Sequence, residues 1–131
     1  MIFVDSGAWF ASVIPTDPDF AAATAWLAGN RETLLTTDYV LDETLTLLRS
    51  RGQPHIALAL GAALVTGTLA VLHYCTKDEI LLAWDTFQRY SDKEWSFTDC
   101  VSKVVMERLA IRTAFAFDQH FRQFGTVSVV P

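Results

Sequence analysis

Short apolar runs alternate along this chain with longer segments that carry helix-start signals, and this alternation most limits the folds open to it. Runs of three to five residues with strand character lie at positions 2–4, 34–37, 69–73, 113–117 and 127–130. Neighbouring parallel strands need crossover connections, which helices usually supply. The pattern therefore predicts an α/β fold with a central, mainly parallel sheet that helices cover on both faces.

Caps and glycine or proline stops mark the expected helices. Asp17-Pro18 places a cap and a proline before a helix over residues 19–28. Thr76 and Glu79 match the S/T-x-x-E capping box and predict a helix that runs to about Tyr90. Other helices are expected at residues 8–11, 38–51, 54–66 and 99–109.

Length and composition fit one domain. The 131 residues are 51% hydrophobic and 19% charged, which is enough apolar surface for one core, so we expect a single domain over residues 1–131. Cys75 and Cys100 are too few for a disulfide scaffold, and no cluster of cysteine and histidine offers a zinc site. We expect a reducing, cytoplasmic location.

Residues 53–76 contain no Asp, Glu, Lys or Arg and approach the ~20 residues that a membrane span requires. Pro54, Gly61 and Gly67 interrupt this stretch, which favours a buried helix, a glycine stop and a buried strand. The N-terminus also lacks the basic segment of a secretory signal. We therefore expect no membrane association.

Four carboxylates are candidates for a functional site. Asp5 and Asp118 follow strands, and Asp99 lies in the first turn of a helix, so all three are expected at the carboxyl edge of the sheet. Glu43 interrupts a largely apolar helix stripe, where an uncompensated carboxylate costs several kcal/mol. A divalent cation would compensate, and oxygen ligands suit Mg²⁺ or Mn²⁺ better than zinc.

Each carboxylate also has an ordinary structural explanation. Asp99 is a typical helix-capping residue, Asp118 a typical surface charge, and Asp5 a typical turn residue. Glu43 is also consistent with a salt bridge at the helix surface. A shared site is favoured because the four acids converge and have no obvious set of basic partners.

The histidines and tryptophans are expected to have structural roles. His55, His73 and His120 are far apart in the sequence, and each is predicted to be a core or surface residue rather than a ligand. The four tryptophans are not interleaved with basic residues, as a base-stacking platform requires, and are assigned to the core or to an interface.

Four segments occur in an order that resembles a known family. They are Phe3-Val4-Asp5-Ser6, Glu43, Ser96-Phe97-Thr98-Asp99 and Phe117-Asp118-Gln119-His120-Phe121. This set, which spans nearly the whole chain, is similar to the PIN domains and, among them, to the single-domain VapC-like toxin ribonucleases. The resemblance implies a three-layer α/β/α sandwich whose acidic pocket binds Mg²⁺ or Mn²⁺ and hydrolyses RNA phosphodiesters. It also implies a homodimer and a cognate antitoxin protein that blocks the site.

Phosphodiester cleavage requires an activated water and stabilisation of charge on the attacking and leaving oxygens, which carboxylate-bound metal provides. We expect Asp5 and Asp99 to be the principal metal ligands, with Glu43 and Asp118 completing the site directly or through water. The hydroxyls of Ser6 and Thr98 are expected to orient these carboxylates, although both residue types are also common in turns and caps. Gly7 departs from the family pattern, because many relatives have a hydroxyl residue at this position.

The net charge of −5 is unusual for a nucleic-acid-binding protein. The chain has fifteen acidic and ten basic residues. Without the four proposed site acids, eleven acidic residues remain against the ten basic ones, so the rest of the surface is nearly neutral. This balance predicts weak intrinsic affinity for RNA. Candidate phosphate contacts are Arg49, Arg51, Lys93 and Lys103, each of which is also explained as an ordinary surface charge.

Two other functions are compatible with parts of the sequence. A catalytically idle PIN-like domain would bind RNA or protein without turnover, but all four acids are present. A phosphoacceptor module of the receiver type also places aspartates at strand ends around Mg²⁺. Receivers carry paired acids after the first strand and a lysine after the last, whereas Ser6-Gly7 follows Asp5 here and no lysine follows Phe117.

Overall fold

The computed structural model describes residues 1–131. Five strands form one sheet: β1 (Ile2–Val4), β2 (Leu34–Thr37), β3 (Val71–His73), β4 (Thr113–Phe115) and β5 (Ser128–Val130). The helices are α1 (Ser6–Val13), α2 (Phe20–Gly29), α3 (Asp38–Ser50), α4 (Pro54–Val65), α5 (Lys77–Arg89) and α6 (Phe97–Arg108). A 3₁₀ helix, η1 (Gln119–Phe124), precedes the last strand.

The sheet has the strand order β3-β2-β1-β4-β5, and every neighbouring pair is parallel. The predicted α/β fold with a mainly parallel sheet is therefore confirmed, and the last edge strand is parallel as well. Phe3 on the central strand pairs with Leu35 on β2 and with Ala114 on β4. The first strand thus lies between segments from early and late parts of the chain.

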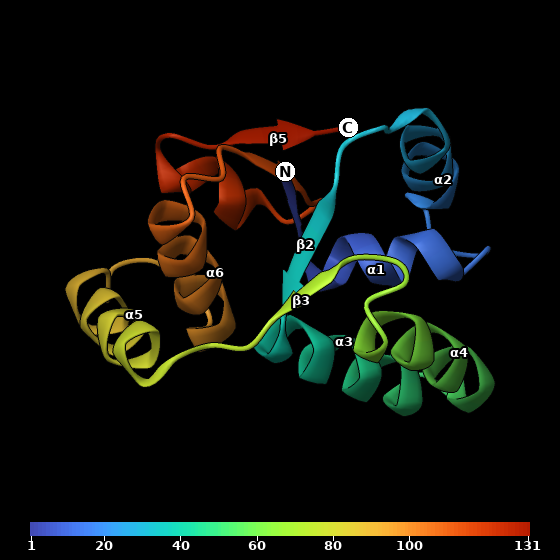
Figure 1. Cartoon of the computed structure of the whole chain (residues 1–131), viewed down its shortest axis with the longest axis horizontal. Coiled ribbons are helices and arrows are strands. Elements are labelled where there is room, and N and C mark those ends of the chain that lie inside the picture. The colour runs from blue at the N-terminus through green and yellow to red at the C-terminus, as the bar shows by residue number, and fades with distance from the viewer.

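Helices cover both faces of the sheet (Figure 1). In this view α5 and α6 lie to one side of the strands, and α1 and α2 lie to the other. The chain proceeds from β1 through β2 to β3 in one direction and then returns past β1 to β4 and β5. The strand order therefore reverses between β1 and β4. Open α/β sheets bind ligands beyond the carboxyl ends of the strands at such a switch point.

Buried side chains fix the central strand and the residue that follows it, Asp5. Phe3 and Val4 are fully buried, and Trp9 of α1 is nearly so. The Trp9 indole Nε1 donates a hydrogen bond to Thr36 Oγ1 at 3.2 Å, and the Thr36 hydroxyl donates to the Val4 carbonyl oxygen at 2.9 Å. These bonds satisfy buried polar atoms and hold β2 and α1 against the end of β1.

Several predicted boundaries are displaced by about two residues, and α1 covers Ser6–Val13 rather than residues 8–11. β3 begins at Val71 rather than at residue 69, because the turn at Gly67, with a φ of 72°, extends to residue 70. β4 ends at Phe115, two residues early. α6 begins at Phe97 rather than at residue 99, because Ser96 is the cap that accepts a hydrogen bond from the backbone of the third helical residue.

The apolar stretch over residues 53–76 divides into α4, a turn and β3, as the sequence predicts. The expectation that β3 is buried is wrong: β3 is an edge strand, and its Val71 side chain is 45% exposed. No helix in the structure has both the length and the apolar character needed to cross a membrane.

Candidate active site

Two of the predicted acids lie beyond the strands that flank the switch point. Asp5 directly follows β1, and its backbone N–H donates to the Phe115 carbonyl oxygen at 3.1 Å. Asp118 lies three residues beyond β4 and caps η1, where its side chain accepts a hydrogen bond from the His120 backbone N–H at 2.9 Å. Parallel pairing of β1 with β4 therefore brings both residues to one edge of the sheet.

Asp5 is the most unusual of the four carboxylates. Its side chain is buried, and its Oδ1 atom has no hydrogen-bond partner. Burial raises the pKa of Asp5 from 3.8 to about 7; a hydrogen bond from the Ser6 backbone opposes this shift, and the charges of Asp99, Glu43 and Asp118 add to it. Unpartnered buried polar atoms are rare in native proteins. A cation would supply the partner that this buried oxygen lacks.

Glu43 reaches this cluster from α3 through a hydrogen bond with α1. The Ser6 hydroxyl donates to Glu43 Oε1 and holds the partly buried carboxylate near Asp5. Ser6 is the first residue of α1, so the turn after β1 positions both Asp5 and the hydroxyl that orients Glu43. This contact agrees with the orienting role that the sequence suggests for Ser6.

Asp99 is held at the third position of α6 by a reciprocal cap. The Asp99 backbone N–H donates to Ser96 Oγ at 3.0 Å, and Asp99 Oδ2 accepts from the Ser96 backbone N–H at 3.0 Å. Thr98 occupies the same turn, but its hydroxyl donates to none of the four carboxylates. Ser96 is therefore the hydroxyl residue that orients Asp99 in this structure.

His120 is a site residue that the sequence did not identify. Its Nδ1 atom lies 2.8 Å from Asp99 Oδ2 and 3.4 Å from Asp118 Oδ1. Burial opposes a positive charge on this ring, but the Asp99 hydrogen bond and the nearby acids outweigh burial and raise the pKa of His120. The one sequence signal is the spacing, since His120 follows Asp118 by two residues.

Asp99, Asp118 and His120 place one potential ligand atom each within 4.8 Å of one another. Glu43, Asp99 and Asp118 lie close enough to Asp5 for their negative charges to raise its pKa. Four carboxylates, one of which has a buried oxygen without a partner, form the oxygen-rich donor set that Mg²⁺ and Mn²⁺ prefer. The residues present therefore fit a hard divalent cation.

Gly7, which stands where many relatives have a hydroxyl residue, leaves space beside this cluster. A Cβ atom at position 7 would meet only Asp5 Oδ2, at 4.0 Å. A serine here would have room for its hydroxyl near the Asp5 carboxylate. The Cβ position therefore lies near Asp5 Oδ2, whereas the oxygen without a hydrogen-bond partner is Oδ1.

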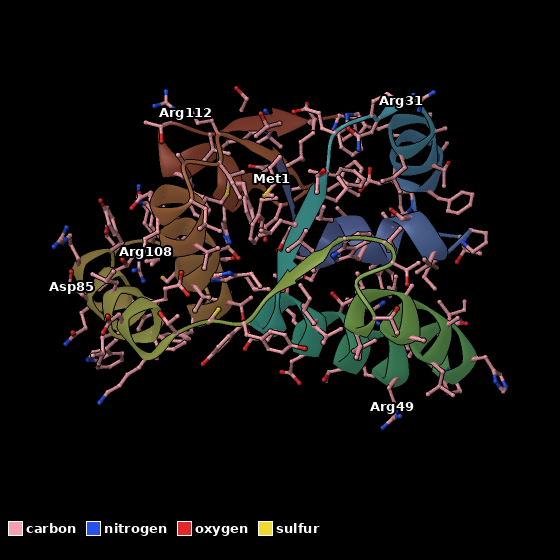
Figure 2. All side chains as sticks on the ribbon, in the orientation of Figure 1. Met1, Arg31, Arg49, Asp85, Arg108 and Arg112 are labelled. Carbon is pink, nitrogen blue, oxygen red and sulfur yellow. The ribbon has the colours of Figure 1, made fainter.

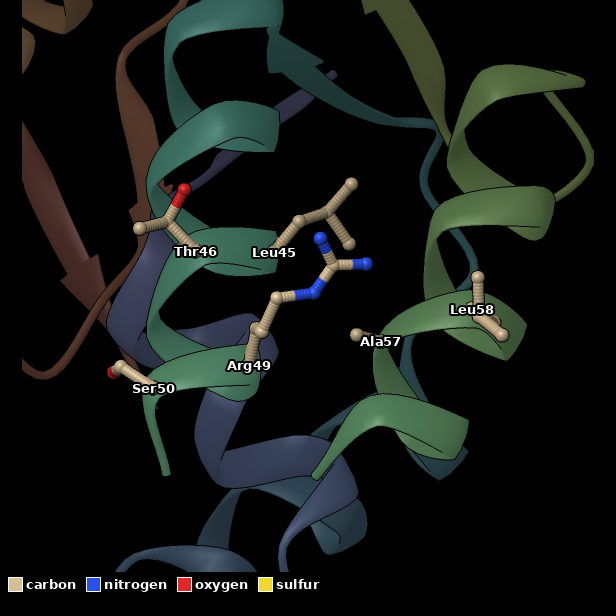
Figure 3. A pocket seen from close by; sticks show the side chains of 6 residues that line it. All are labelled: Leu45, Thr46, Arg49, Ser50, Ala57 and Leu58. Atoms are coloured by element: carbon tan, nitrogen blue, oxygen red, sulfur yellow. The ribbon is translucent and has the colours of Figure 1, made fainter. Parts of the chain in front are cut away.

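Two of the candidate phosphate contacts, Arg49 and Lys103, have other surroundings than the four acids. Arg49 lies near the far end of α3 from the sheet edge and lines a cavity of about 390 Å³ between α3 and α4. Figure 3 shows its guanidinium beside Leu45 and facing Ala57 across the groove. Lys103 forms an ion pair with Glu107, one helical turn further along α6. Neither residue is placed beside the four carboxylates.

Comparisons with known proteins identify the family of this chain. The PIN domain family model matches residues 2–127. The chain is 35% identical over 131 residues to the 23S rRNA-specific endonuclease VapC20 of Mycobacterium tuberculosis, and the match covers 100% of this chain and 99% of that protein. The chain therefore belongs to the PIN domain family, in its VapC toxin ribonuclease branch.

Solved structures support the same assignment. The crystal structure of M. tuberculosis VapC20, described as a sarcin-ricin loop cleaving toxin, superposes with a TM-score of 0.93 at 34% identity and full coverage of both chains. A VapC ribonuclease of Archaeoglobus fulgidus is 34% identical over 90 residues, covering 67% of this chain and 55% of that protein. FitAcB from Neisseria gonorrhoeae, at 14% identity and a TM-score of 0.72, shares the fold.

Binding of Mn²⁺ is expected to tighten as the pH rises through about 7. A carboxyl group must lose its proton before it binds metal, and the pKa of Asp5 is raised to about 7. Below this value each bound ion displaces a proton, so the affinity falls by up to about tenfold per pH unit. Isothermal titration one unit below and one unit above pH 7 measures the change. Equal affinities at both values would contradict a ligand role for Asp5.

Ser6→Ala is expected to weaken Mn²⁺ binding by roughly tenfold, the lower end of the range for loss of a group that orients a ligand. The variant removes the donor that holds Glu43 in place. Ser12→Ala is the matched control, because Ser12 lies on the same helix and its hydroxyl donates only to the Ala8 carbonyl oxygen. An equal loss in both variants would indicate a general effect on α1.

Proposed function

We propose that this chain is a metal-dependent endoribonuclease that cleaves a structured region of ribosomal RNA and acts as the toxin of a toxin–antitoxin pair. The observation that carries the proposal is the buried carboxylate of Asp5, whose Oδ1 atom has no hydrogen-bond partner and whose neighbours at the switch point of the sheet are three further acids. The 23S rRNA specificity of the VapC20 relative from M. tuberculosis supports the choice of substrate class.

The proposed roles of the residues follow from their environments. Asp5 and Asp99 are the principal ligands, and Glu43 and Asp118 complete the site. When bound, Mg²⁺ or Mn²⁺ lowers the pKa of a coordinated water and neutralises charge on the scissile phosphate. Ser6 orients Glu43, and Ser96 orients Asp99. Thr98 stays a candidate for orienting a carboxylate once the site binds metal.

His120 has a distinct proposed role at this site. Its Nδ1 atom lies 2.8 Å from Asp99 Oδ2 and 3.4 Å from Asp118 Oδ1, and a positive charge on the ring offsets part of the repulsion between these two acids. Its raised pKa favours the charged form that makes this contact strongest. His120 thus keeps the two acids at a separation suited to a shared ligand, and it does so without contacting the substrate.

The proposed partners are an antitoxin protein and a second copy of this chain. An antitoxin that inserts a basic side chain among the four carboxylates would replace the cation and block the site, since Asp5 Oδ1 is a free acceptor there. This mode of inhibition rests on the proposed metal site. Homodimerisation rests on membership of the VapC branch.

Cleavage of end-labelled RNA tests the proposal. Purified protein is incubated with 23S ribosomal RNA fragments and with unrelated structured RNAs, in Mg²⁺, Mn²⁺ or EDTA. We expect cleavage at discrete positions in the ribosomal fragments, dependence on metal, and loss of activity in Asp99→Asn. Asp42→Asn is the control, because Asp42 is an exposed acid beside Glu43 without a hydrogen bond or ion pair.

Intact RNA in every reaction would contradict the proposal, provided that the protein is folded and free of antitoxin. Binding of the RNA without cleavage in Mn²⁺ would instead identify an idle PIN-like domain. Cleavage that persists in EDTA or in Asp99→Asn would preserve the nuclease but overturn the metal site.

A further inference from the structure

The 3₁₀ helix η1 contacts the start of α6 through two side chains. His120 Nδ1 lies 2.8 Å from Asp99 Oδ2, and the Trp95 indole Nε1 donates a hydrogen bond to Gln123 Oε1 at 2.7 Å. The second contact joins residues 28 apart in the sequence and involves none of the four carboxylates. Because Trp95 directly precedes Ser96, the cap of α6, both contacts lie at the N-terminal end of that helix.

The geometry of η1 places these two contacts on the same face. Side chains three residues apart are aligned in a 3₁₀ helix, so His120 and Gln123 lie one above the other along η1. Phe121 and Phe124 have the same spacing, and both are buried in the core. One face of η1 is thus anchored in the core, and another is aligned with the start of α6.

Packing around Trp95 makes it a rigid partner for this alignment. Its side chain is only 5% exposed, and its ring centroid lies 5.2 Å from Phe124, edge-on, and 4.8 Å from Tyr90. The N–H group of a buried tryptophan usually finds an acceptor. Gln123 is itself exposed, yet its side chain supplies that acceptor. The hydrogen bond therefore ties a mobile kind of side chain on η1 to a fixed ring beside α6.

The other end of α6 is held separately, by the start of α5. Arg108 Nη1 lies 3.8 Å from Glu79 Oε2 and 3.5 Å from Thr76 Oγ1. Figure 2 shows Arg108 beside α6, on the side of α5. Loss of the bond between Trp95 and Gln123 is therefore expected to change how η1 meets the start of α6, without releasing α6 from the rest of the protein.

The position of η1 matters because Asp118 is its cap. A 3₁₀ helix has poorer hydrogen-bond geometry than an α-helix, and η1 has only six residues before Gly125, whose φ is 90°. Its side-chain contacts must therefore fix its position. The potential ligand atoms of Asp99 and Asp118 lie within 4.8 Å of each other across this junction. A shift of η1 against α6 changes that separation.

Divalent cations differ in how precisely their ligands must be placed. Mg²⁺ binds in near-ideal octahedral geometry with ligands at about 2.0–2.1 Å, whereas Ca²⁺ accepts flexible geometry at about 2.3–2.6 Å. A change in the separation of two carboxylates therefore weakens the binding of Mg²⁺ more than that of Ca²⁺. This difference separates an effect on ligand placement from a general loss of structure.

We propose that Trp95 and Gln123 are positioning residues, which fix η1 against the start of α6 and so set the separation of Asp99 from Asp118. The proposal rests on the metal site of the proposed function and adds the contact that shapes this site for a small octahedral cation. Neither Trp95 nor Gln123 is a ligand. They act through the two acids that their hydrogen bond holds in register.

Calorimetric titration of the full chain with Mg²⁺ and, separately, with Ca²⁺ tests the proposal. Trp95→Phe and Gln123→Leu remove the same hydrogen bond from opposite sides. Each is expected to weaken Mg²⁺ binding by roughly fivefold, the effect of one net hydrogen bond, and Ca²⁺ binding by less than about twofold. The double variant is expected to match the single variants, because both substitutions remove one shared interaction.

Trp26→Phe and Gln53→Leu are the matched controls. Trp26 is a partly buried ring that packs on Phe115, and its indole N–H donates no hydrogen bond. Gln53 precedes α4, and its side chain makes no capping hydrogen bond. Both variants are expected to bind Mg²⁺ and Ca²⁺ as the wild type does.

A second measurement does not depend on bound metal. In NMR spectra of the metal-free wild type we expect a nuclear Overhauser contact between the His120 ring and the β protons of Asp99, because these side chains touch. The contact is expected to weaken in Trp95→Phe and Gln123→Leu and to persist in both controls. Amide hydrogen exchange in the sheet is expected to stay at the wild-type rate in all variants.

The other outcomes contradict defined parts of the proposal. Wild-type Mg²⁺ affinity in both Trp95→Phe and Gln123→Leu overturns the positioning role and leaves the metal site in place. Equal losses for Mg²⁺ and Ca²⁺, or a double variant much weaker than either single one, also overturn it. A wild type that binds neither ion overturns the metal site of the proposed function. An unchanged contact between His120 and Asp99 in both variants overturns the positioning role with or without metal.

Discussion

Asp5→Asn is expected to lower metal-dependent RNA cleavage by about 10²- to 10³-fold and to raise the melting temperature of the same protein by roughly 5 °C. Activity falls because the amide is a poor ligand for a hard cation. Stability rises because the variant removes a buried charge that is repelled by Asp99, Glu43 and Asp118. Opposite effects on activity and stability are typical of residues that a function requires.

The gain in stability is expected to depend on pH. The folded protein holds the Asp5 proton up to about pH 7, whereas the unfolded chain releases it near pH 3.8. The free energy of unfolding of the wild type therefore falls as the pH rises between these two values, and it stays at the lower level above them. The asparagine side chain neither binds nor releases a proton in this pH range. The variant should thus differ little from wild type in acid and most above pH 7.

Thermal melting of metal-free protein at several pH values, together with the RNA assay, measures both effects. Asp42→Asn makes the same chemical change at an exposed acid one residue before Glu43 and is expected to alter neither quantity. A destabilised Asp5→Asn protein would mean that the hydrogen bond from the Ser6 backbone to the Asp5 carboxylate outweighs the cost of burial and repulsion. Wild-type cleavage by this variant would remove Asp5 from the site.

Phe121→Ala is expected to lower the free energy of unfolding by about 3–5 kcal/mol, the usual cost of deleting a buried aromatic side chain. Phe121 is fully buried, with ring centroids 6.0 Å from Phe3 and 4.8 Å from Phe124. It also anchors η1, which carries His120 and is capped by Asp118. The cavity that the substitution creates therefore lies next to Asp118 and His120 of the candidate site.

Urea unfolding measures the loss of stability, and Mn²⁺ titration of the folded variant measures the effect on the site. We expect weaker Mn²⁺ binding, because η1 no longer holds Asp118 in a fixed position. Phe20→Ala is the control: Phe20 is only partly buried at the start of α2 and is expected to cost about 1 kcal/mol. Unchanged Mn²⁺ affinity in Phe121→Ala would show that Asp118 and His120 do not contribute to binding.

The sequence predicts those features of the site that depend on neighbouring residues. Asp5 directly follows its strand, and a parallel sheet brings the carboxyl ends of its strands to one edge, so its location is set locally. Glu43 is conspicuous because a carboxylate on an apolar helix face requires compensation. The ambiguous case is Ser96-Phe97-Thr98-Asp99, where two hydroxyl residues compete as the cap. Only the structure shows that Ser96 accepts the hydrogen bond.

The contacts that the sequence cannot predict join distant segments. His120 and Asp99 are 21 residues apart, and their contact depends on the turn that η1 makes after β4. The position of η1 depends on the burial of Phe121. The exposure of β3 has a similar origin, because its apolar residues suit a buried strand and only the strand order places them at an edge. Local patterns carry no information about either outcome.

Pairing of β1 with β4 joins residues 3 and 114, and this has a consequence for synthesis of the protein. The first acid leaves the ribosome at the start of translation, but the strand that completes its surroundings is made near the end. Contacts between such distant residues form late, because the chain between them must first be ordered. A growing chain therefore has no complete acidic cluster, and the ribosome that makes this protein has nearly finished before the protein is able to cut RNA.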